Sequence, residues 1–286
     1  MTKASEWFRH NYFRTYRISN HVEDVAKNPM SYISDFLQNL VPEGLPVDWI
    51  LPWQKESILH KFARFIADMT FYNDLNGPTL TVKDPRKYPP EWILPVDLAL
   101  ISYGISDKVF MGPSKPYPAD AAEHYEADAY YDYFVQNLLP SAIYDNLLNT
   151  IADEVFFIVF MNRSALAALN RFAATYVGDM DFDWDAHDGE DDESLFESFG
   201  QLKRKAPPKW AKNAVFFRDR GKCVYCARDL SGLLGTFPNS NYDHVVPLAR
   251  GGLNDVTNLQ LLCESCNAEK ADHPYEPSNR YQRWYH

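Results

Sequence analysis

The stretch from Asp243 to Lys270 reads DHVVPLARGGLNDVTNLQLLCESCNAEK and concentrates residue types that carry chemistry. An aspartate–histidine pair opens it, within a β-branched run from Tyr242 to Leu248 that is typical of an extended segment. The pair Gly251-Gly252 permits a tight turn. A Cys-x-x-Cys pair and an asparagine close the stretch, so several potential ligands stand at fixed spacings within one short segment.

The chain contains four cysteines, and all of them lie in or just before this stretch. They form two Cys-x-x-Cys pairs separated by a long loop: Cys223, Cys226, Cys263 and Cys266. Paired spacing with no further cysteine favours a metal site over disulfides. Four thiolates make the tetrahedral site that zinc prefers, with iron as the minor alternative, and leave no position open for substrate. We therefore expect a structural zinc ion.

The residues between and after the cysteine pairs resemble the HNH endonuclease family, in particular its branch with a four-cysteine zinc site. The similarity lies in Asp243-His244, Asn258, Asn267 and Lys270 at their spacings, and it covers about residues 209–275. This resemblance implies a small ββα-metal fold, in which a two-stranded hairpin, a loop and a helix hold one divalent cation.

The resemblance also implies roles for single residues. Asp243 would be a carboxylate ligand of a catalytic Mg²⁺ or Mn²⁺ ion, and Asn267 would be the second ligand through its carbonyl oxygen. The family often has histidine at the latter position, and an amide oxygen is a harder ligand that suits magnesium or manganese. His244 would be the general base, because an imidazole can accept a proton from water near neutral pH.

Three further residues complete the implied site. Asn258 would hold the loop and orient His244 through its amide. Lys270 and Arg250 are placed to bind the scissile or an adjacent phosphate, although a solvated surface role is an alternative for each.

Charge divides the 286-residue chain into two parts. Residues 1–200 hold 15 Lys and Arg against 31 Asp and Glu, whereas residues 201–286 hold 13 against 8. A basic C-terminal part fits binding to a phosphate backbone, and DNA is the expected partner. The longest apolar run, Val155 to Met161, is far shorter than the roughly 20 residues of a membrane span. Without an apolar secretory core at the start, the expected location is cytoplasmic.

We expect a mainly α N-terminal domain, residues 1–178, followed by a linker at 179–208 and an α+β HNH domain at 209–286. Helical spacing predicts helices at 30–40, 54–72, 119–139, 141–161, 164–177 and 209–219, with Ser164 as a cap. Eight prolines between residues 77 and 118 exclude a long helix there. In the acidic run Asp179 to Glu197, the sixth position that must be glycine in a calcium-binding loop is Trp184 or Ala186, counted from Asp179 or Asp181. We therefore interpret the run as a linker that could cover the basic tail.

The expected function is metal-dependent hydrolysis of DNA phosphodiester bonds, as the effector of a bacterial antiviral defence system. The N-terminal domain would bind a protein partner or trigger, or would only position the catalytic part. Two alternatives remain: an HNH enzyme that cleaves RNA, and a catalytically silent, zinc-containing module that binds nucleic acid.

Overall fold

The computed structural model describes residues 3–28, 47–75, 82–83, 92–106, 128–179, 195–198, 200–232 and 240–271. The chain folds into two compact units, each made of two segments. The first unit contains Met1–Val22 and His60–Phe156, and the second contains Glu23–Leu59 and Phe157–His286. None of the described helices is both long and apolar enough to cross a membrane.

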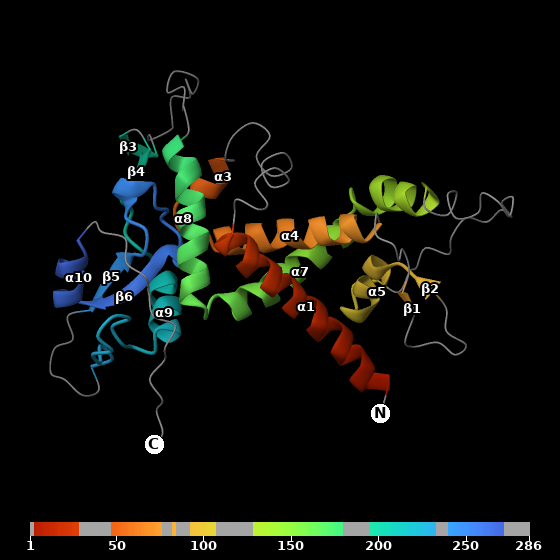
Figure 1. Cartoon of the computed structure of the whole chain (residues 1–286), viewed down its shortest axis with the longest axis horizontal. Helices are drawn as coiled ribbons and strands as arrows, with labels where there is room; N and C mark the ends of the chain where they lie inside the picture. The colour runs from red at the N-terminus through yellow and green to blue at the C-terminus, as the bar shows by residue number, and fades with distance from the viewer. Residues whose placement is uncertain are drawn as a thin grey trace, which may run out of the picture. The chain divides into compact units, whose positions relative to one another are not determined.

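Helices make up most of the first unit, and three of them continue into the second (Figure 1). Its elements are α1 (Lys3–Lys27), α4 (Ile58–Leu75), β1 (Val82–Lys83), β2 (Trp92–Ile93), α5 (Pro95–Ser102), the π-helix η2 (Tyr133–Leu138) and α7 (Ala142–Val159). Apolar side chains on α4, η2 and α7 form the buried core, which includes Phe62, Phe71, Phe134, Tyr144 and Leu147.

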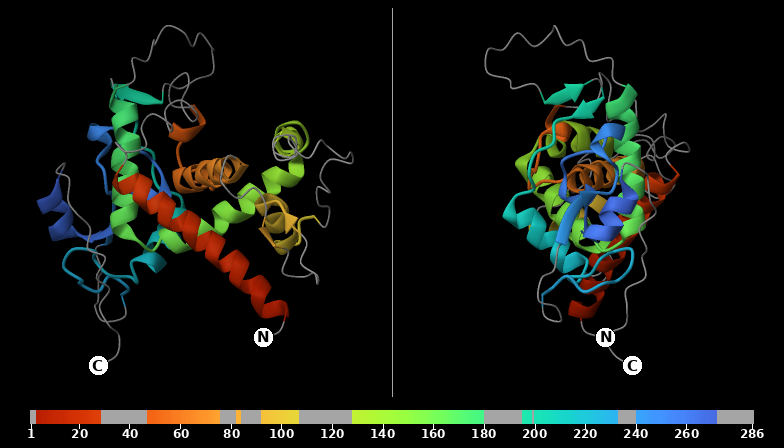
Figure 2. Two further views of the ribbon diagram at one scale, coloured as in Figure 1. Left: turned by 45° about the vertical axis from the view of Figure 1, so that its right-hand side comes forward. Right: turned by 90° about the vertical axis from the view of Figure 1, so that its left-hand side faces the viewer.

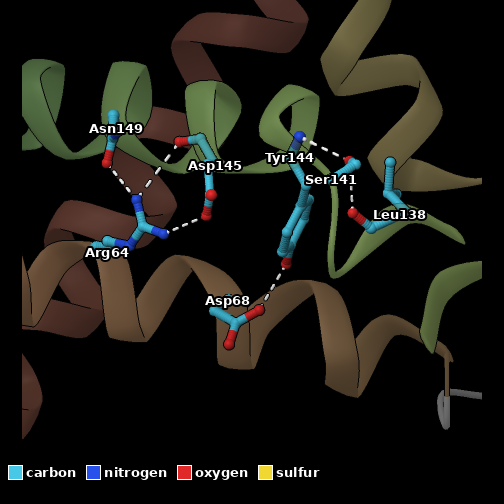
Figure 3. A network of polar contacts seen from close by, with 7 residues as sticks. All are labelled: Arg64, Asp68, Leu138, Ser141, Tyr144, Asp145 and Asn149. Atoms are coloured by element: carbon cyan, nitrogen blue, oxygen red, sulfur yellow. Dashed lines mark hydrogen bonds and ion pairs between the residues drawn. The ribbon is translucent and has the colours of Figure 1, made fainter. Parts of the chain in front are cut away.

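Polar contacts also join α4 to α7 in the first unit (Figure 3). The hydroxyl of Tyr144 donates a 2.7 Å hydrogen bond to Asp68 Oδ1. One turn away, Arg64 forms an ion pair with Asp145 and donates a hydrogen bond to Asn149. The buried tyrosine ring and its polar tip therefore fix how these two helices pack.

The second unit holds the short elements of the C-terminal region together with α8. Its elements are α3 (Val47–Ile50), α8 (Arg163–Asp179), β3 (Phe196–Ser198), β4 (Gln201–Leu202), α9 (Lys209–Arg218), β5 (Ser240–His244), the 3₁₀ turns η4 (Leu248–Arg250) and η5 (Val256–Asn258), β6 (Leu259–Cys263) and α10 (Glu264–Lys270). Strands β5 and β6 pair antiparallel, with Asp243 opposite Gln260 and His244 opposite Leu259. Helix α10 lies beside this hairpin, and α9 lies against β6 (Figure 2).

The predicted fold class is confirmed: a mainly helical N-terminal region precedes a small β-hairpin and helix that carry the four cysteines. The domain boundaries at 178 and 209 remain a prediction, and the two compact units divide the chain elsewhere. Part of the predicted linker forms a hairpin, because β3 pairs with β4.

Several predicted helices agree with the structure to within a few residues, but three details differ. Helix α1 lies in a segment for which no helix was predicted, whereas the helix predicted at 30–40 falls outside the described residues. The segment 119–139 is described from residue 128, where an α-helical turn passes into η2. Helix α8 begins at Arg163, so its cap is Asn162, whose Oδ1 accepts a 3.2 Å bond from the backbone N–H of Ala165, and not Ser164.

Candidate active site and metal cluster

The first cysteine pair sits in a tight turn before the hairpin. The backbone N–H of Ala227 donates to the carbonyl of Cys223 at 2.9 Å, and Ala227 has a φ of 60°, in the left-handed region. This turn brings the Cys226 thiol back toward that of Cys223. The N–H of Val224 donates to the carbonyl of Leu261 at 3.0 Å, which attaches the turn to β6.

The second pair begins at the last residue of β6 and continues into the first turn of α10, so that Cys263 and Cys266 face the first pair. All four Sγ atoms lie within 4.8 Å of one another, and those of Cys226 and Cys263 are 3.7 Å apart. A tetrahedral zinc with Zn–S bonds of about 2.3 Å places its sulfurs roughly 3.8 Å apart. The cluster is therefore consistent with a structural zinc site, as the sequence predicts.

Asp243 lies near the end of β5, on the face of the hairpin that is opposite to His244, because side chains alternate along a strand. Its Oδ2 atom accepts a 2.8 Å contact from Lys270 Nζ and a 3.2 Å hydrogen bond from Gln260 Nε2. Lys270 is buried, and it also donates to the carbonyl of His244 at 2.9 Å. The ammonium thus points at Asp243, and its role as a phosphate ligand remains a prediction.

Asn267 and Arg250 occupy very different positions. Asn267 precedes Lys270 by three residues on α10, so the two side chains lie on the same side of the helix, one turn apart, and Asn267 is half-buried. This places the amide on the side of α10 that faces Asp243. Arg250 is exposed at the end of η4.

The imidazole of His244 is almost completely buried, with 2% of the residue exposed. Neither of its ring nitrogens has a hydrogen-bond partner among the described residues. Burial lowers the pKa of His244 to about 4, and the positive charge of Arg204 acts in the same direction while Asp243 opposes it. A hydrogen bond from Asn254 to the ring would raise the pKa of His244. The Asn254 amide instead bonds to the backbone of residues 203 and 205, so this effect is minor. At neutral pH the ring is therefore uncharged, which is the form that accepts a proton.

Asn258 is fully buried and braces the loop between the two strands. Its Nδ2 donates to the carbonyls of Val246 at 3.0 Å and Leu253 at 2.9 Å, and its Oδ1 accepts from the N–H of Val246 at 2.8 Å. Its backbone carbonyl also accepts a 2.7 Å bond from the N–H of Val245, next to His244. The side chain thus bonds to the backbone of the loop at both ends, and its role in orienting His244 remains a prediction.

The turn at Gly251-Gly252 is required by close packing as well as by backbone conformation. Gly251 has a φ of 78°, and a Cβ atom there would lie 2.6 Å from the carbonyl oxygen of Ala174 on α8. A Cβ atom on Gly252 would lie 2.0 Å from the carbonyl oxygen of Val246. The loop of the hairpin therefore rests directly on the backbone of α8.

Sequence reasoning missed a buried charge network behind the hairpin. Both nitrogens of an Arg218 fork contact the Asp219 carboxylate at 2.9 Å, and Arg163 Nε from α8 lies 3.7 Å from Asp219 Oδ1. Arg218 also donates to the carbonyl of Leu259 at 2.6 Å, and Asp219 accepts from the N–H of Leu261 at 3.1 Å. The adjacent Arg-Asp pair in the sequence is the signal that could have revealed this anchor of β6.

It also missed a contact from the N-terminal region. The ring of Trp53 lies 6.1 Å from that of His244, centroid to centroid, and its backbone N–H donates to the carbonyl of Asn254 at 2.8 Å. Nearby, the side chain of Asp255 accepts hydrogen bonds from the N–H groups of Ile58 and Thr257 at 3.0 and 2.8 Å. No local sequence signal links residues 53–58 to residues 244–257.

Known proteins are similar in sequence to this region, which contains the β5–β6 hairpin, its loop, α10 and the cysteine cluster. The model of the HNH endonuclease family matches residues 223–273. Residues 223–273 are an HNH endonuclease domain. A segment of 59 residues, 20% of this chain, is 37% identical to the CRISPR-associated endonuclease Cas9 of Corynebacterium diphtheriae. That segment spans 5% of the Cas9 chain. No solved structure gives a significant match.

Proposed function

We propose that this protein is a metal-dependent endonuclease that hydrolyses phosphodiester bonds of DNA at the HNH domain. One observation supports this most: a buried, uncharged imidazole with unpartnered ring nitrogens directly follows a carboxylate at the end of β5. A module that only binds nucleic acid has no use for this pair. Its cysteines and basic residues would be sufficient.

Asp243 and Asn267 offer oxygen donors that fit a hard divalent cation such as Mg²⁺ or Mn²⁺. Asp243 Oδ1 makes no hydrogen bond with the described residues, and the side chain is 15% exposed. The ammonium of Lys270 on Oδ2 shows that this position already attracts positive charge. A divalent cation held by Asp243 and Asn267 would supply charge neutralisation at the phosphate.

In this proposal His244 accepts a proton from the attacking water, and the hydroxide formed displaces the 3′ oxygen in line at phosphorus. A ring without hydrogen bonds keeps a nitrogen lone pair available for that proton. Asn258 sets the path of the backbone on both sides of the loop and so limits how the ring can move.

DNA is the preferred substrate because the family acts mostly on DNA, and residues 201–286 carry a net positive charge. RNA is the alternative within the same chemistry. The similarity to a CRISPR-associated endonuclease supports a role as a defence effector, with the acidic N-terminal region binding a partner or trigger.

The test is cleavage of supercoiled plasmid, and of a labelled RNA, by the purified chain with Mg²⁺ or Mn²⁺. His244→Ala should slow cleavage by about 100- to 10,000-fold, the usual contribution of a general base. His60→Ala is the matched control, because His60 stacks on Phe156 in the first unit and is not one of the residues of the HNH domain. Equal rates for the wild type and His244→Ala would contradict the assignment of the base, and cleavage of RNA alone would select the alternative substrate.

A further inference from the structure

A side chain that binds the scissile phosphate must carry a positive charge that no neighbouring carboxylate already neutralises. Lys270 does not meet this condition in the structure, because its ammonium is buried against Asp243 Oδ2 and the carbonyl of His244. Arg204, just before the HNH domain, does meet it. Its side chain is exposed, and it forms no ion pair or hydrogen bond with the residues that the structure describes.

The backbone around Arg204 is held on both sides by one amide. Asn254 Nδ2 donates to the carbonyl of Lys203 at 2.9 Å, and Asn254 Oδ1 accepts from the N–H of Lys205 at 3.3 Å. These bonds run between the segment that follows β4 and the loop of the hairpin. Arg204 therefore projects from a backbone that is attached to the HNH loop, although it lies outside the segment that matches the family.

Trp53 contacts the segment around Arg204, the hairpin loop and the ring of His244. Its indole Nε1 donates to the carbonyl of Lys205 at 3.1 Å, its backbone N–H donates to Asn254, and its ring is 6.1 Å from the His244 ring. Trp53 has a φ of 55°, a left-handed conformation that a bulky residue rarely adopts. Its contacts therefore connect residues 203–205 with the surroundings of the imidazole.

The backbone on both sides of Arg204 is thus bonded to the hairpin loop through Asn254 and to the ring next to His244 through Trp53. Arg204 is therefore a solvent-facing cation on a segment that is attached next to the buried proton acceptor. A phosphodiester placed for attack near His244 would meet it.

We propose that Arg204 is a catalytic residue that binds the non-bridging oxygens of the scissile phosphodiester. This inference rests on the proposed nuclease function and adds to it a phosphate ligand from outside the HNH segment. The planar guanidinium can donate two parallel hydrogen bonds to a phosphate, and it offsets the negative charge that develops there as the hydroxide attacks. It exchanges no proton, because it stays charged throughout.

The experiment compares Arg204→Ala, Arg204→Lys and Lys209→Ala in the full chain, with cleavage measured at saturating protein. Lys209 is an exposed cation at the start of α9, so its variant controls for the loss of one positive charge near the domain. Arg204→Ala should lower the saturating rate by about 100-fold, as expected for a donor to a developing negative charge. Arg204→Lys should recover part of it, because lysine supplies the charge without the fork. Lys209→Ala should change apparent affinity only.

Zinc content and thermal unfolding show whether each variant is folded, and Arg204 is exposed, so its replacement should leave both unchanged. If the wild type cleaves and Arg204→Ala stays within a few-fold of Lys209→Ala at saturation, the assignment of Arg204 is wrong and the nuclease proposal stands. If the folded wild type cleaves neither DNA nor RNA, the nuclease proposal fails and this inference fails with it.

Discussion

In the first unit, three acidic side chains accept hydrogen bonds from tyrosine hydroxyls, whereas in the second unit three others face cations and backbone N–H groups. The first pattern includes Tyr144 with Asp68, Tyr133 with Asp97 and Tyr103 with Glu154. The second includes Asp219 with two arginines, Asp243 with Lys270 and Asp255 with two backbone amides. A tyrosine hydroxyl does not neutralise the charge of the carboxylate that it binds. In a buried ion pair, by contrast, removal of either partner leaves the other as an uncompensated buried charge.

Both units have an apolar core, but the second unit adds a buried charge network and a four-cysteine cluster. The hairpin that carries Asp243 and His244 has only two strands, which are marginal alone. The buried ion network and the cysteine cluster supply the support that such a small element lacks. Variants that remove only one of these interactions can therefore show how much each contributes to the stability of its unit.

The largest expected effect comes from the cysteine cluster. Cys263→Ser removes a thiolate at the junction of β6 and α10, so the protein should lose zinc and the second unit should lose several kcal/mol of stability. Hydrogen exchange should show lost protection in β5 and β6 with little change in α7 up to Phe156. Zinc readdition to chelated wild-type protein is the control, and full protection of the hairpin in zinc-free protein would contradict a structural metal.

The second prediction compares a carboxylate of each kind. Asp219→Asn leaves the charges of Arg163 and Arg218 buried without a counter-charge, so it should cost about 3–5 kcal/mol. Asp97→Asn in the first unit keeps a hydrogen-bond acceptor for Tyr133 and should cost about 1 kcal/mol. Urea denaturation measures both. Equal losses would show that the two units do not differ in this respect.

The third prediction concerns pH. Burial raises the pKa of Asp68, against the opposing effects of Tyr144 and Arg64, so the folded chain holds this proton more tightly than the unfolded chain does. The stability that it contributes is complete below the ordinary aspartate pKa and is lost as pH rises through the folded-state value. Asp68→Asn should remove this loss, so its stability should fall less between acidic and neutral pH than that of the wild type. Asp145→Asn, an exposed carboxylate nearby, is the control. Parallel pH profiles would contradict the assignment.

The smallest effect is expected for the exposed ion pair of the first unit. Arg64→Ala removes contacts to Asp145 and Asn149 that are partly solvated, so it should cost about 1 kcal/mol or less. Arg163→Ala, which removes a cation from the buried network, should cost clearly more. Thermal unfolding of the two variants side by side measures this order, and the reverse order would count against the buried network as a support.

The sequence predicts the part of the site that lies within one short segment. The spacing of the two cysteine pairs predicts the cluster because each pair is closed by a local turn. Likewise, Asp243 and His244 are adjacent in one strand, so alternation places them without knowledge of the fold. The role of Asn258 is implied only by the resemblance to the HNH family and stays a prediction, although its place just before β6 puts it in the loop.

The rest of the site depends on contacts between distant parts of the chain. Trp53 and Asn254 meet because the segment before α4 lies against the loop of the hairpin, and neither residue carries a local signal of this. The same limit applies to the contact between Lys270 and Asp243, which are 27 residues apart in the chain and which no local pattern brings together. Helix α1 was missed although its buried residues Ile18, Val22 and Val25 fall at helical spacing, because aromatic and charged residues are mixed among them.

The contact between Gly251 and the carbonyl of Ala174 has a consequence for how this domain could be moved between proteins. Transfer of residues 209–286 alone would separate the glycine turn from the backbone of α8 on which it packs. A host protein would have to offer a bare stretch of backbone at the same place. A transferable unit would therefore have to include α8, together with residues 53–58, which contact the same loop.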